Sequence, residues 1–222
     1  MTSNAILCST WRLYVIVDRA AVGAHDPVAV ASAAIRGGAD VLQWRDKEAD
    51  DASFLRIACQ MYDVARAAGV ALILNDRVEL AAALGADGVH LGQEDLPIAE
   101  ARARLGPGAL IGKSTHSVAQ ARTAVRDGAD YLGFGPLYPT PTKPDYPSVG
   151  LEQIRAVQGA VAVPVVCIGG VDEQRLGAVL AAGAERVAVV RAVCSAQNPQ
   201  AAARRLRTIL TETLHVMPPR SL

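Results

Sequence analysis

Three cations and two carboxylates occur in segments that follow short apolar runs of the chain. The cations are Arg45, Lys47 and Lys143, and the carboxylates are Asp76 and Asp95. Arginine presents a planar fork to phosphate oxygens, whereas lysine offers a point charge. Carboxylates together with substrate phosphates form the usual environment of Mg²⁺, which prefers hard oxygen ligands. These residue types predict a site for a diphosphate bridged by Mg²⁺.

A second anion site is expected from glycines and hydroxyl groups. Gly169-Gly170 follows another apolar run, and in barrels of parallel strands this place commonly holds a single phosphate. Ser114-Thr115-His116 precedes a helix expected to begin near Ser117, where free backbone N–H groups favour an anion. No nucleophile with an activating base is evident, since neighbours in sequence do not make a catalytic triad. A reaction that needs only a stabilised leaving group fits these residues better.

A recurring phrase indicates how the chain positions these residues. Gly-Ala-Asp or Gly-Ala-Glu begins at residues 38, 85, 128 and 183, each time after an Ala-rich helical stretch and before an apolar run. Glycine suits the left-handed end of a helix, so the repeating unit is helix, glycine stop and strand. The apolar runs are mostly continuous, as in parallel strands buried on both faces. They cover residues 13–17, 40–44, 71–75, 88–91, 109–112, 131–133, 164–168 and 186–190.

Helical patterns alternate with these strands and set the fold class. They cover residues 51–67, 117–126, 172–181 and 199–210, with shorter ones at 78–84, 97–105 and 151–157. The expected N-caps are Asp51 or Ser53, Ser117 and Asp172. Strands alternating with helices predict an α/β protein, a single eight-stranded parallel (β/α)8 barrel of the TIM type. A doubly wound open sheet fits less well, because no G-x-G-x-x-G follows the first strand.

The barrel is expected to span residues 1–222 as one domain, with loose tails at 1–10 and 215–222. All carboxyl ends of its strands would meet on one face, where barrel enzymes build their active sites. The polar residues named above follow strands, whereas the helix-to-strand turns carry Gly, Ala and Asp. This asymmetry predicts an enzyme. The loop at 137–149 is expected to close as a lid, since water must be kept from a reactive cation.

Composition excludes several classes of function. The chain has 22 Lys and Arg against 22 Asp and Glu, and aromatic residues make up 4%, which leaves little to bind nucleic acid. The longest apolar run, 161–171, contains Pro164 and is too short to span a bilayer. Four cysteines without a C-x-x-C pair are typical of apolar fillers in a reducing compartment. A cytoplasmic protein that binds small molecules, with no nucleic acid or membrane partner, is expected. Whether it forms a homo-oligomer is left open.

Six segments together resemble one family, thiamine-phosphate synthase. The resemblance runs in order from about residue 13 to residue 193. Its motifs are Gln43-Trp44-Arg45-Asp46-Lys47, Asn75-Asp76-Arg77, the D-G-V-H-L-G-Q-E-D of residues 87–95, Ser114-Thr115-His116, the segment 130–143, and Ile168-Gly169-Gly170. Three positions depart from the family pattern: Trp44 replaces a usual Leu, Lys113 a common apolar residue, and Arg191 a frequent Ser.

The resemblance implies a Mg²⁺-dependent transferase. The family joins 4-amino-2-methyl-5-pyrimidinylmethyl diphosphate to a thiazole phosphate, or to its carboxy form, and the diphosphate leaves before the thiazole nitrogen attacks. The pyrimidine diphosphate would be held by Gln43, Arg45, Lys47, Asn75, Ser114 and Lys143, of which Arg45, Lys47, Ser114 and Lys143 are the catalytic candidates. Asp76 and Asp95 would bind the metal. The thiazole phosphate would be held by Thr140, Thr142, Gly169, Gly170, Val190 and Arg191.

Two other functions and several residues stay open on the sequence alone. A related thiazole tautomerase usually carries a His where Pro136 stands here, and it lacks the metal carboxylates. A non-catalytic phosphate binder would require a silenced site. His90 is more typical of a hydrogen-bonded structural residue than of a catalytic base. His116 and Trp44 are each balanced between a structural role and a place at the site.

Overall fold

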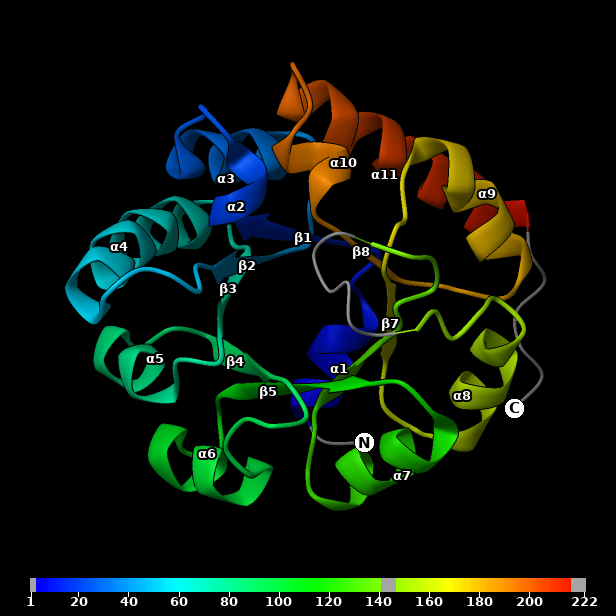
Figure 1. Cartoon of the computed structure of the whole chain (residues 1–222), viewed down its shortest axis with the longest axis horizontal. Helices are drawn as coiled ribbons and strands as arrows, with labels where there is room; N and C mark the ends of the chain where they lie inside the picture. Colours follow the sequence, from blue (N-terminus) through cyan, green and yellow to red (C-terminus); the bar gives the residue numbers. More distant parts are fainter. Residues whose placement is uncertain (1–2, 141–146, 217–222) are drawn as a thin grey trace.

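Eight parallel strands close into a barrel in the order of the chain. The structure, a computed structural model, describes residues 3–140 and 147–216. Each strand pairs with the next, and β8 pairs with β1 through Tyr14 and Ala188, so the sheet has no open edge (Figure 1). The predicted barrel is therefore confirmed and the open doubly wound sheet is excluded. The strands are β1 (Leu13–Asp18), β2 (Val41–Arg45), β3 (Ala71–Asn75), β4 (Gly88–Leu91), β5 (Leu110–Thr115), β6 (Tyr131–Phe134), β7 (Val165–Ile168) and β8 (Val187–Val189).

Helices surround the barrel on its outside (Figure 1). The outer ring consists of α3 (Pro27–Arg36), α4 (Asp51–Ala67), α5 (Val78–Leu84), α6 (Ile98–Leu105), α7 (Val118–Arg126), α8 (Gln153–Ala160), α9 (Glu173–Ala181) and α11 (Pro199–Val216). Two four-residue helices, α2 (Arg19–Val22) and α10 (Arg191–Cys194), follow β1 and β8. The caps of α7 and α9 are Ser117 and Asp172 as expected, whereas α4 is capped by Asp50 and by neither of the predicted residues, Asp51 or Ser53.

The recurring Gly-Ala-Asp phrase has two structural roles. Its glycines at 38, 85, 128 and 183 all adopt positive φ, between 68° and 106°, as the predicted helix stops require. The carboxylates then tie one strand to the one before it. Asp40 accepts from the Leu13 N–H at 2.8 Å, and Asp87 accepts from the Leu72 N–H at 2.8 Å. Asp130 repeats the contact with the Ile111 N–H at 2.9 Å. The phrase therefore sets the register at the amino end of the barrel.

Apolar side chains form two layers, one between strands and helices and one inside the barrel. Trp44 belongs to the outer layer, where its ring packs against Phe54 at 5.7 Å. This answers the question of its role, since Trp44 is fully buried and does not line the central cavity. Cys8, Cys167 and Cys194 are buried as expected, whereas Cys59 is exposed. Burial raises the pKa of Cys8 and of Cys194 to about 12.

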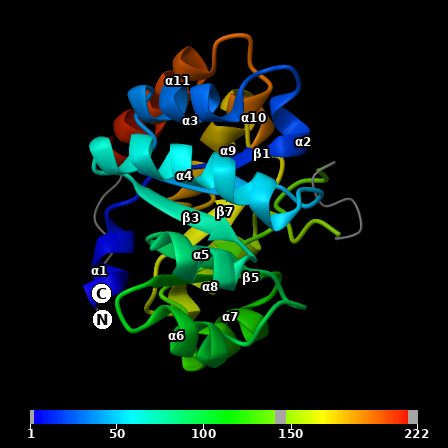
Figure 2. The ribbon, with the colours of Figure 1, turned by 90° about the vertical axis from the view of Figure 1, so that its left-hand side faces the viewer.

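The expected loose tail at residues 1–10 is wrong for most of its length, because α1 (Ser3–Ser9) closes the amino end of the barrel. Asn4 donates through Nδ2 to the Ala109 carbonyl oxygen at 3.0 Å, and Arg186 donates to the Ser9 carbonyl oxygen at 2.8 Å. In the side view α1 lies at one end, opposite the loops that follow the strands (Figure 2). At the other terminus α11 continues to Val216, past the predicted end at 210.

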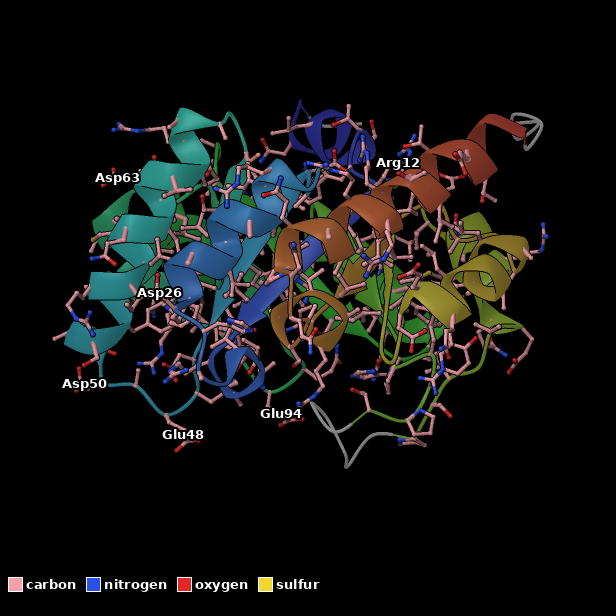
Figure 3. The ribbon with its side chains drawn as sticks, turned by 90° about the horizontal axis from the view of Figure 1, so that it is seen from above. Arg12, Asp26, Glu48, Asp50, Asp63 and Glu94 are labelled. Carbon is pink, nitrogen blue, oxygen red and sulfur yellow. The ribbon has the colours of Figure 1, made fainter. Side chains whose placement is uncertain are left out.

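The two ends of the barrel carry different residues. Figure 3 shows Arg12 near α1, whereas Glu48 and Glu94 lie at the opposite end with the loops that follow β2 and β4.

Among the helices that the structure describes, none combines the length and the apolar character needed to cross a membrane.

Candidate active site

A cavity of about 260 Å³ opens at the carboxyl end of the barrel. Its lining comes from strands and loops around the ring and includes nine of the residues that the sequence singled out. These are Gln43, Arg45, Asn75, Ser114, Thr140, Gly169, Gly170, Val190 and Arg191. Thr142 and Lys143 lie outside the described residues, together with the rest of segment 141–146. The structure thus brings these nine candidates around one cavity, while their individual roles stay predictions.

Arg45 ends β2 and is held by the end of β1. The two residues are register partners, and the Arg45 guanidinium forms an ion pair with Asp18. Asp18 is only 2% exposed and also caps α2 by accepting from the Ala20 N–H at 2.9 Å. A guanidinium has five N–H donors, and the contact with Asp18 uses one nitrogen. Arg45 is therefore oriented by Asp18 while it keeps donors for an anion in the cavity.

Lys47, Asp76 and Asp95 form a charged cluster at the rim, outside the cavity lining. Lys47 Nζ forms an ion pair with Asp76, and the Asp76 and Asp95 carboxyl groups interact electrostatically with each other. Asp95 also accepts from the Gly92 N–H at 2.6 Å. Asp76 is the one non-glycine residue with positive φ, at 60°, within residues 3–140 and 147–216. A strained backbone of this kind is typical of positions where function fixes a side chain.

The two carboxyl groups have shifted pKa values in opposite directions. Burial and the interaction with the Asp95 carboxyl raise the pKa of Asp76 above its ordinary value, although Lys47 acts against this shift. Burial also acts to raise the pKa of Asp95, but other contacts outweigh this effect and the pKa is lowered. These contacts are the interaction with the Asp76 carboxyl, the hydrogen bond from the Gly92 N–H, and the nearby charges of Lys47 and Lys113. Asp76 is therefore the more readily protonated of the two carboxyl groups.

This donor set fits a divalent cation that a ligand helps to hold. A cation placed here would relieve the repulsion between the two carboxylates, and it would compete with Lys47 for Asp76. The described residues include no cluster of three or more His, Cys, Asp or Glu side chains able to hold a metal. Two carboxylates completed by phosphate oxygens match the binding mode of Mg²⁺. Asp76 and Asp95 are thus suited to hold Mg²⁺ together with a bound phosphate group.

Hydrogen bonds link five side chains across the floor of the cavity. Gln43 Nε2 donates to the Tyr14 hydroxyl at 2.7 Å, and the hydroxyls of Tyr14 and Tyr131 lie 3.0 Å apart. His90 connects Tyr131, at 3.2 Å from its Nδ1, to the Ser114 hydroxyl, at 3.0 Å from its Nε2. Burial raises the pKa of both tyrosines well above the ordinary range, so both are neutral hydroxyls. We call this the floor chain.

One polarity satisfies every link of the floor chain. Because Gln43 donates to Tyr14, the Tyr14 proton can go to Tyr131 and the Tyr131 proton to His90 Nδ1. His90 then carries its proton on Nε2 and donates to Ser114. This arrangement leaves the Ser114 hydroxyl proton to donate into the cavity. The preference for a hydrogen-bonded structural role at His90 agrees with these contacts.

Glycines make room for the floor chain and for the opposite end of the cavity. A Cβ at Gly112 would lie 2.2 Å from Cζ of Tyr131 and 2.5 Å from Nδ1 of His90. A Cβ at Gly169 would lie 2.4 Å from Cα of Pro136, and Gly169 also has φ of 102°. Side chains at these two positions would therefore displace the groups that shape the cavity.

Arg175 closes the end of the cavity where Gly169-Gly170 lies. Its guanidinium donates to the Gly170 carbonyl oxygen at 2.9 Å and lies over the Tyr138 ring at 4.9 Å. It connects α9 to the loops after β6 and β7. Arg191 begins α10 and is exposed at the same end. Two guanidinium groups therefore stand beside the predicted single-phosphate position.

Sequence reasoning missed Tyr14, Tyr131 and Arg175 and left the role of Asp18 undecided. The tyrosines lie in apolar strands and Arg175 lies in a helix, so the signal used for the other candidates, a polar residue that follows a strand, did not find them. His116, left balanced, lines the cavity and bonds through Nδ1 to the Gly135 carbonyl oxygen.

Comparison with known proteins agrees with this geometry. A sequence model described as thiamine monophosphate synthase matches residues 13–193. The chain belongs to this family. The predicted resemblance is thereby confirmed over the range in which its motifs were found.

Individual relatives point the same way. A thiamine-phosphate synthase of Chloroflexus aurantiacus is 47% identical over 204 residues, which cover 91% of this chain and 94% of that protein. One of Gloeobacter violaceus is 52% identical over 172 residues, 78% of this chain but half of that longer protein. The solved thiamine phosphate pyrophosphorylase of Pyrococcus furiosus has a TM-score of 0.85 at 37% identity, covering 92% of this chain and 97% of that one. The chain is an enzyme of the transferase class, and its family supports thiamine-phosphate synthase activity.

Proposed function

We propose that this protein joins 4-amino-2-methyl-5-pyrimidinylmethyl diphosphate to 4-methyl-5-(2-hydroxyethyl)thiazole phosphate, or to its carboxy form, in a Mg²⁺-dependent reaction that releases diphosphate. One observation carries the proposal. A cavity with a neutral polar floor lies between a rim of cations and paired carboxylates and an end formed by Gly169-Gly170 and two arginines. Two anionic groups with a neutral heterocyclic region between them match this arrangement.

The diphosphate belongs at the rim. Arg45 keeps donors beyond its ion pair with Asp18, and Lys47 can exchange Asp76 for a phosphate oxygen. Asn75 and the predicted contact of Lys143 would add donors to the same group. Asp76 and Asp95 would hold Mg²⁺, which, when bound, supplies positive charge that stabilises the departing diphosphate.

The pyrimidine belongs on the floor. An aminopyrimidine offers ring nitrogens that accept hydrogen bonds and an amino group that donates them. The Gln43 amide and the Ser114 hydroxyl can meet both needs, and the neutral tyrosines add no charge against a cation that develops on the ring. At the other end Thr140, Thr142, the Gly169-Gly170 backbone, Val190 and Arg191 would hold the thiazole phosphate.

The reaction then needs charge stabilisation more than proton transfer. The bond between the methylene carbon and the diphosphate oxygen breaks, and its electron pair leaves with the diphosphate. Arg45 and Lys47 neutralise the charge that develops there, as preorganised donors do in other enzymes. The lone pair of the thiazole nitrogen forms the new carbon–nitrogen bond. The chain's part is to orient the two substrates and exclude water from the reactive methylene cation.

The test is to mix the purified protein with both substrates and read thiamine phosphate as thiochrome fluorescence, with Mg²⁺ and with EDTA. Product that depends on Mg²⁺ is expected. Asp95→Asn should lower turnover by about a hundredfold or more, the scale of losing a group that stabilises developing charge. Glu94→Gln removes the same charge from the neighbouring exposed residue and should leave turnover unchanged. Binding of both substrates without product would instead support a non-catalytic binder.

A further inference from the structure

Trp11 lies directly beneath the two tyrosines of the floor chain. Its ring meets Tyr14 edge-on at 5.9 Å and 79°, and it meets Tyr131 edge-on at 5.2 Å and 75°. Trp11 is 3% exposed and does not line the cavity. The tyrosines therefore stand between Trp11 and any molecule that occupies the cavity.

Helix α1 and the residues after it hold Trp11 in place. The backbone N–H of Trp11 donates to the Cys8 carbonyl oxygen at 3.3 Å. Ser9, two residues before Trp11, accepts from Arg186 at 2.8 Å and from Arg12 at 3.0 Å through its carbonyl oxygen. Asn4 fixes the start of the helix to the strand that begins at Leu110 by donating to Ala109. Trp11 is thus anchored to the barrel wall and not only to its own helix.

The position of the two tyrosine rings decides whether the floor chain exists. Their hydroxyls lie 3.0 Å apart, and the contact between Tyr131 and His90 Nδ1 is 3.2 Å. A hydrogen bond is lost beyond about 3.5 Å, so a ring displacement of well under 1 Å would break these links. An edge-on aromatic neighbour restricts both the tilt and the position of a ring. Trp11 makes such an edge-on contact with each of the two tyrosines.

We propose that Trp11 is a positioning residue for the reaction: it holds Tyr14 and Tyr131, and through them the orientation of Gln43, His90 and Ser114. The inference rests on the proposed function, since it assigns these floor residues to the pyrimidine. Trp11 touches no substrate. Its effect is on the alignment of the pyrimidine methylene carbon with the attacking nitrogen, whereas the charged side chains of the diphosphate rim make their ion pairs with residues outside the floor chain.

The test compares Trp11→Leu with Trp44→Leu. Both remove a buried indole, but Trp44 lies outside the barrel wall against Phe54 and away from the cavity. We expect Trp11→Leu to lower kcat by about tenfold to a hundredfold, the scale of a misplacement near 1 Å. Its affinity for inorganic diphosphate with Mg²⁺, measured by calorimetry, should stay within about twofold of the wild type because the rim is intact. Trp44→Leu should keep kcat per folded molecule, and Trp11→Phe should restore most of the activity because it keeps an aromatic edge.

A spectroscopic readout uses the native Trp11. The sequence has two tryptophans, so Trp44→Phe leaves Trp11 as the single indole. The pyrimidine diphosphate should change the fluorescence of that indole, whereas inorganic diphosphate with Mg²⁺ should not. Unchanged fluorescence, or equal losses of kcat in the two leucine variants, would overturn the role of Trp11. A wild-type protein that forms no thiamine phosphate would overturn the proposed function itself, and that assay is done first. If Trp11→Leu fails to fold, Trp11→Phe and the fluorescence experiment still decide.

Discussion

Removing the two floor hydroxyls in turn and together gives a sharp test of the floor chain. Tyr14→Phe leaves the Gln43 Nε2 donor without its partner, while Tyr131 can still donate to His90. Tyr131→Phe removes two contacts: the Tyr14 hydroxyl proton loses its acceptor, although that hydroxyl still accepts from Gln43, and His90 Nδ1 loses the Tyr131 donor. The double variant also costs two groups a contact, since Gln43 Nε2 loses its acceptor and His90 Nδ1 loses the same donor. The second substitution therefore adds little once Tyr131 is already Phe.

The magnitudes follow from that count. An unpaired buried polar group costs roughly 1–3 kcal/mol, so about 2 kcal/mol is taken for each. The free energy of unfolding should fall by about 2 kcal/mol in Tyr14→Phe and by about 4 kcal/mol in Tyr131→Phe. The double variant should also lose about 4 kcal/mol, and not the 6 kcal/mol or so that additivity requires. A coupling energy near 2 kcal/mol is expected for side chains whose hydroxyls lie 3.0 Å apart.

Urea unfolding of the four proteins measures this coupling. Tyrosine and phenylalanine differ by one buried hydroxyl, so the slope of the unfolding free energy with urea should be the same in all four. Free-energy changes that add to within about 0.5 kcal/mol would refute the chain, because independent sites behave in that way. Thiamine phosphate formation should fall further in Tyr131→Phe than in Tyr14→Phe, because Tyr131→Phe removes the contact through which the chain reaches His90 and Ser114.

Three further predictions concern the rim, the floor glycine and the outer layer. The raised pKa of Asp76 means that this carboxyl must lose a proton to bind Mg²⁺. The activation constant for Mg²⁺ should therefore rise as pH falls toward that pKa, and calorimetry should detect the released proton. An activation constant that is independent of pH would contradict this prediction. Gly112→Ala should destabilise the protein by about 1–3 kcal/mol or more and abolish turnover, because the new Cβ would clash with Tyr131. Gly108→Ala is the control: a Cβ there has open space around it, so stability and turnover should be nearly unchanged. Trp44→Phe should change the free energy of unfolding by less than about 1 kcal/mol, because the smaller ring is offset by removal of a buried indole N–H that has no hydrogen-bond partner among the described residues. A large fall in that free energy, measured by urea unfolding, would contradict this reasoning.

The fold could be predicted because its signals are local. Each glycine stop adopts the left-handed backbone that its position after a helix demands, and β3 and β4 begin and end where the apolar runs do. Helix α1 escaped prediction because seven residues carry too little periodicity, and its stability comes from contacts with distant segments such as Ala109 and Arg186. The capping of α4 by Asp50 lies one residue from Asp51, the nearer of the two predicted caps, and an error of this size is typical of element boundaries.

The site residues also divide into those with a local sequence signal and those placed by contacts between distant segments. Arg45, Asp76 and Asp95 were identifiable because charged residues that follow an apolar strand are unusual, and parallel strands bring their carboxyl ends together. Arg175 could not be identified in this way, since a charged residue within a helix is usually a solvated one. Its contacts with Gly170 and Tyr138 exist only after α9 packs beside two loops.

The floor chain did leave a signal that strand geometry can extract. Side chains alternate between the two faces of a strand, so a predicted cavity residue fixes the inward face of its whole strand. Ser114 implies that Gly112 also faces inward, and the absence of a side chain there leaves space beside it. Tyr131 is the register partner of Gly112, and the tyrosine fills that space with a hydroxyl 3.2 Å from His90. An inward-facing glycine two residues before a predicted ligand contact therefore indicates that a large side chain of the neighbouring strand fills the space beside it. Here that side chain is Tyr131, the middle residue of the floor chain.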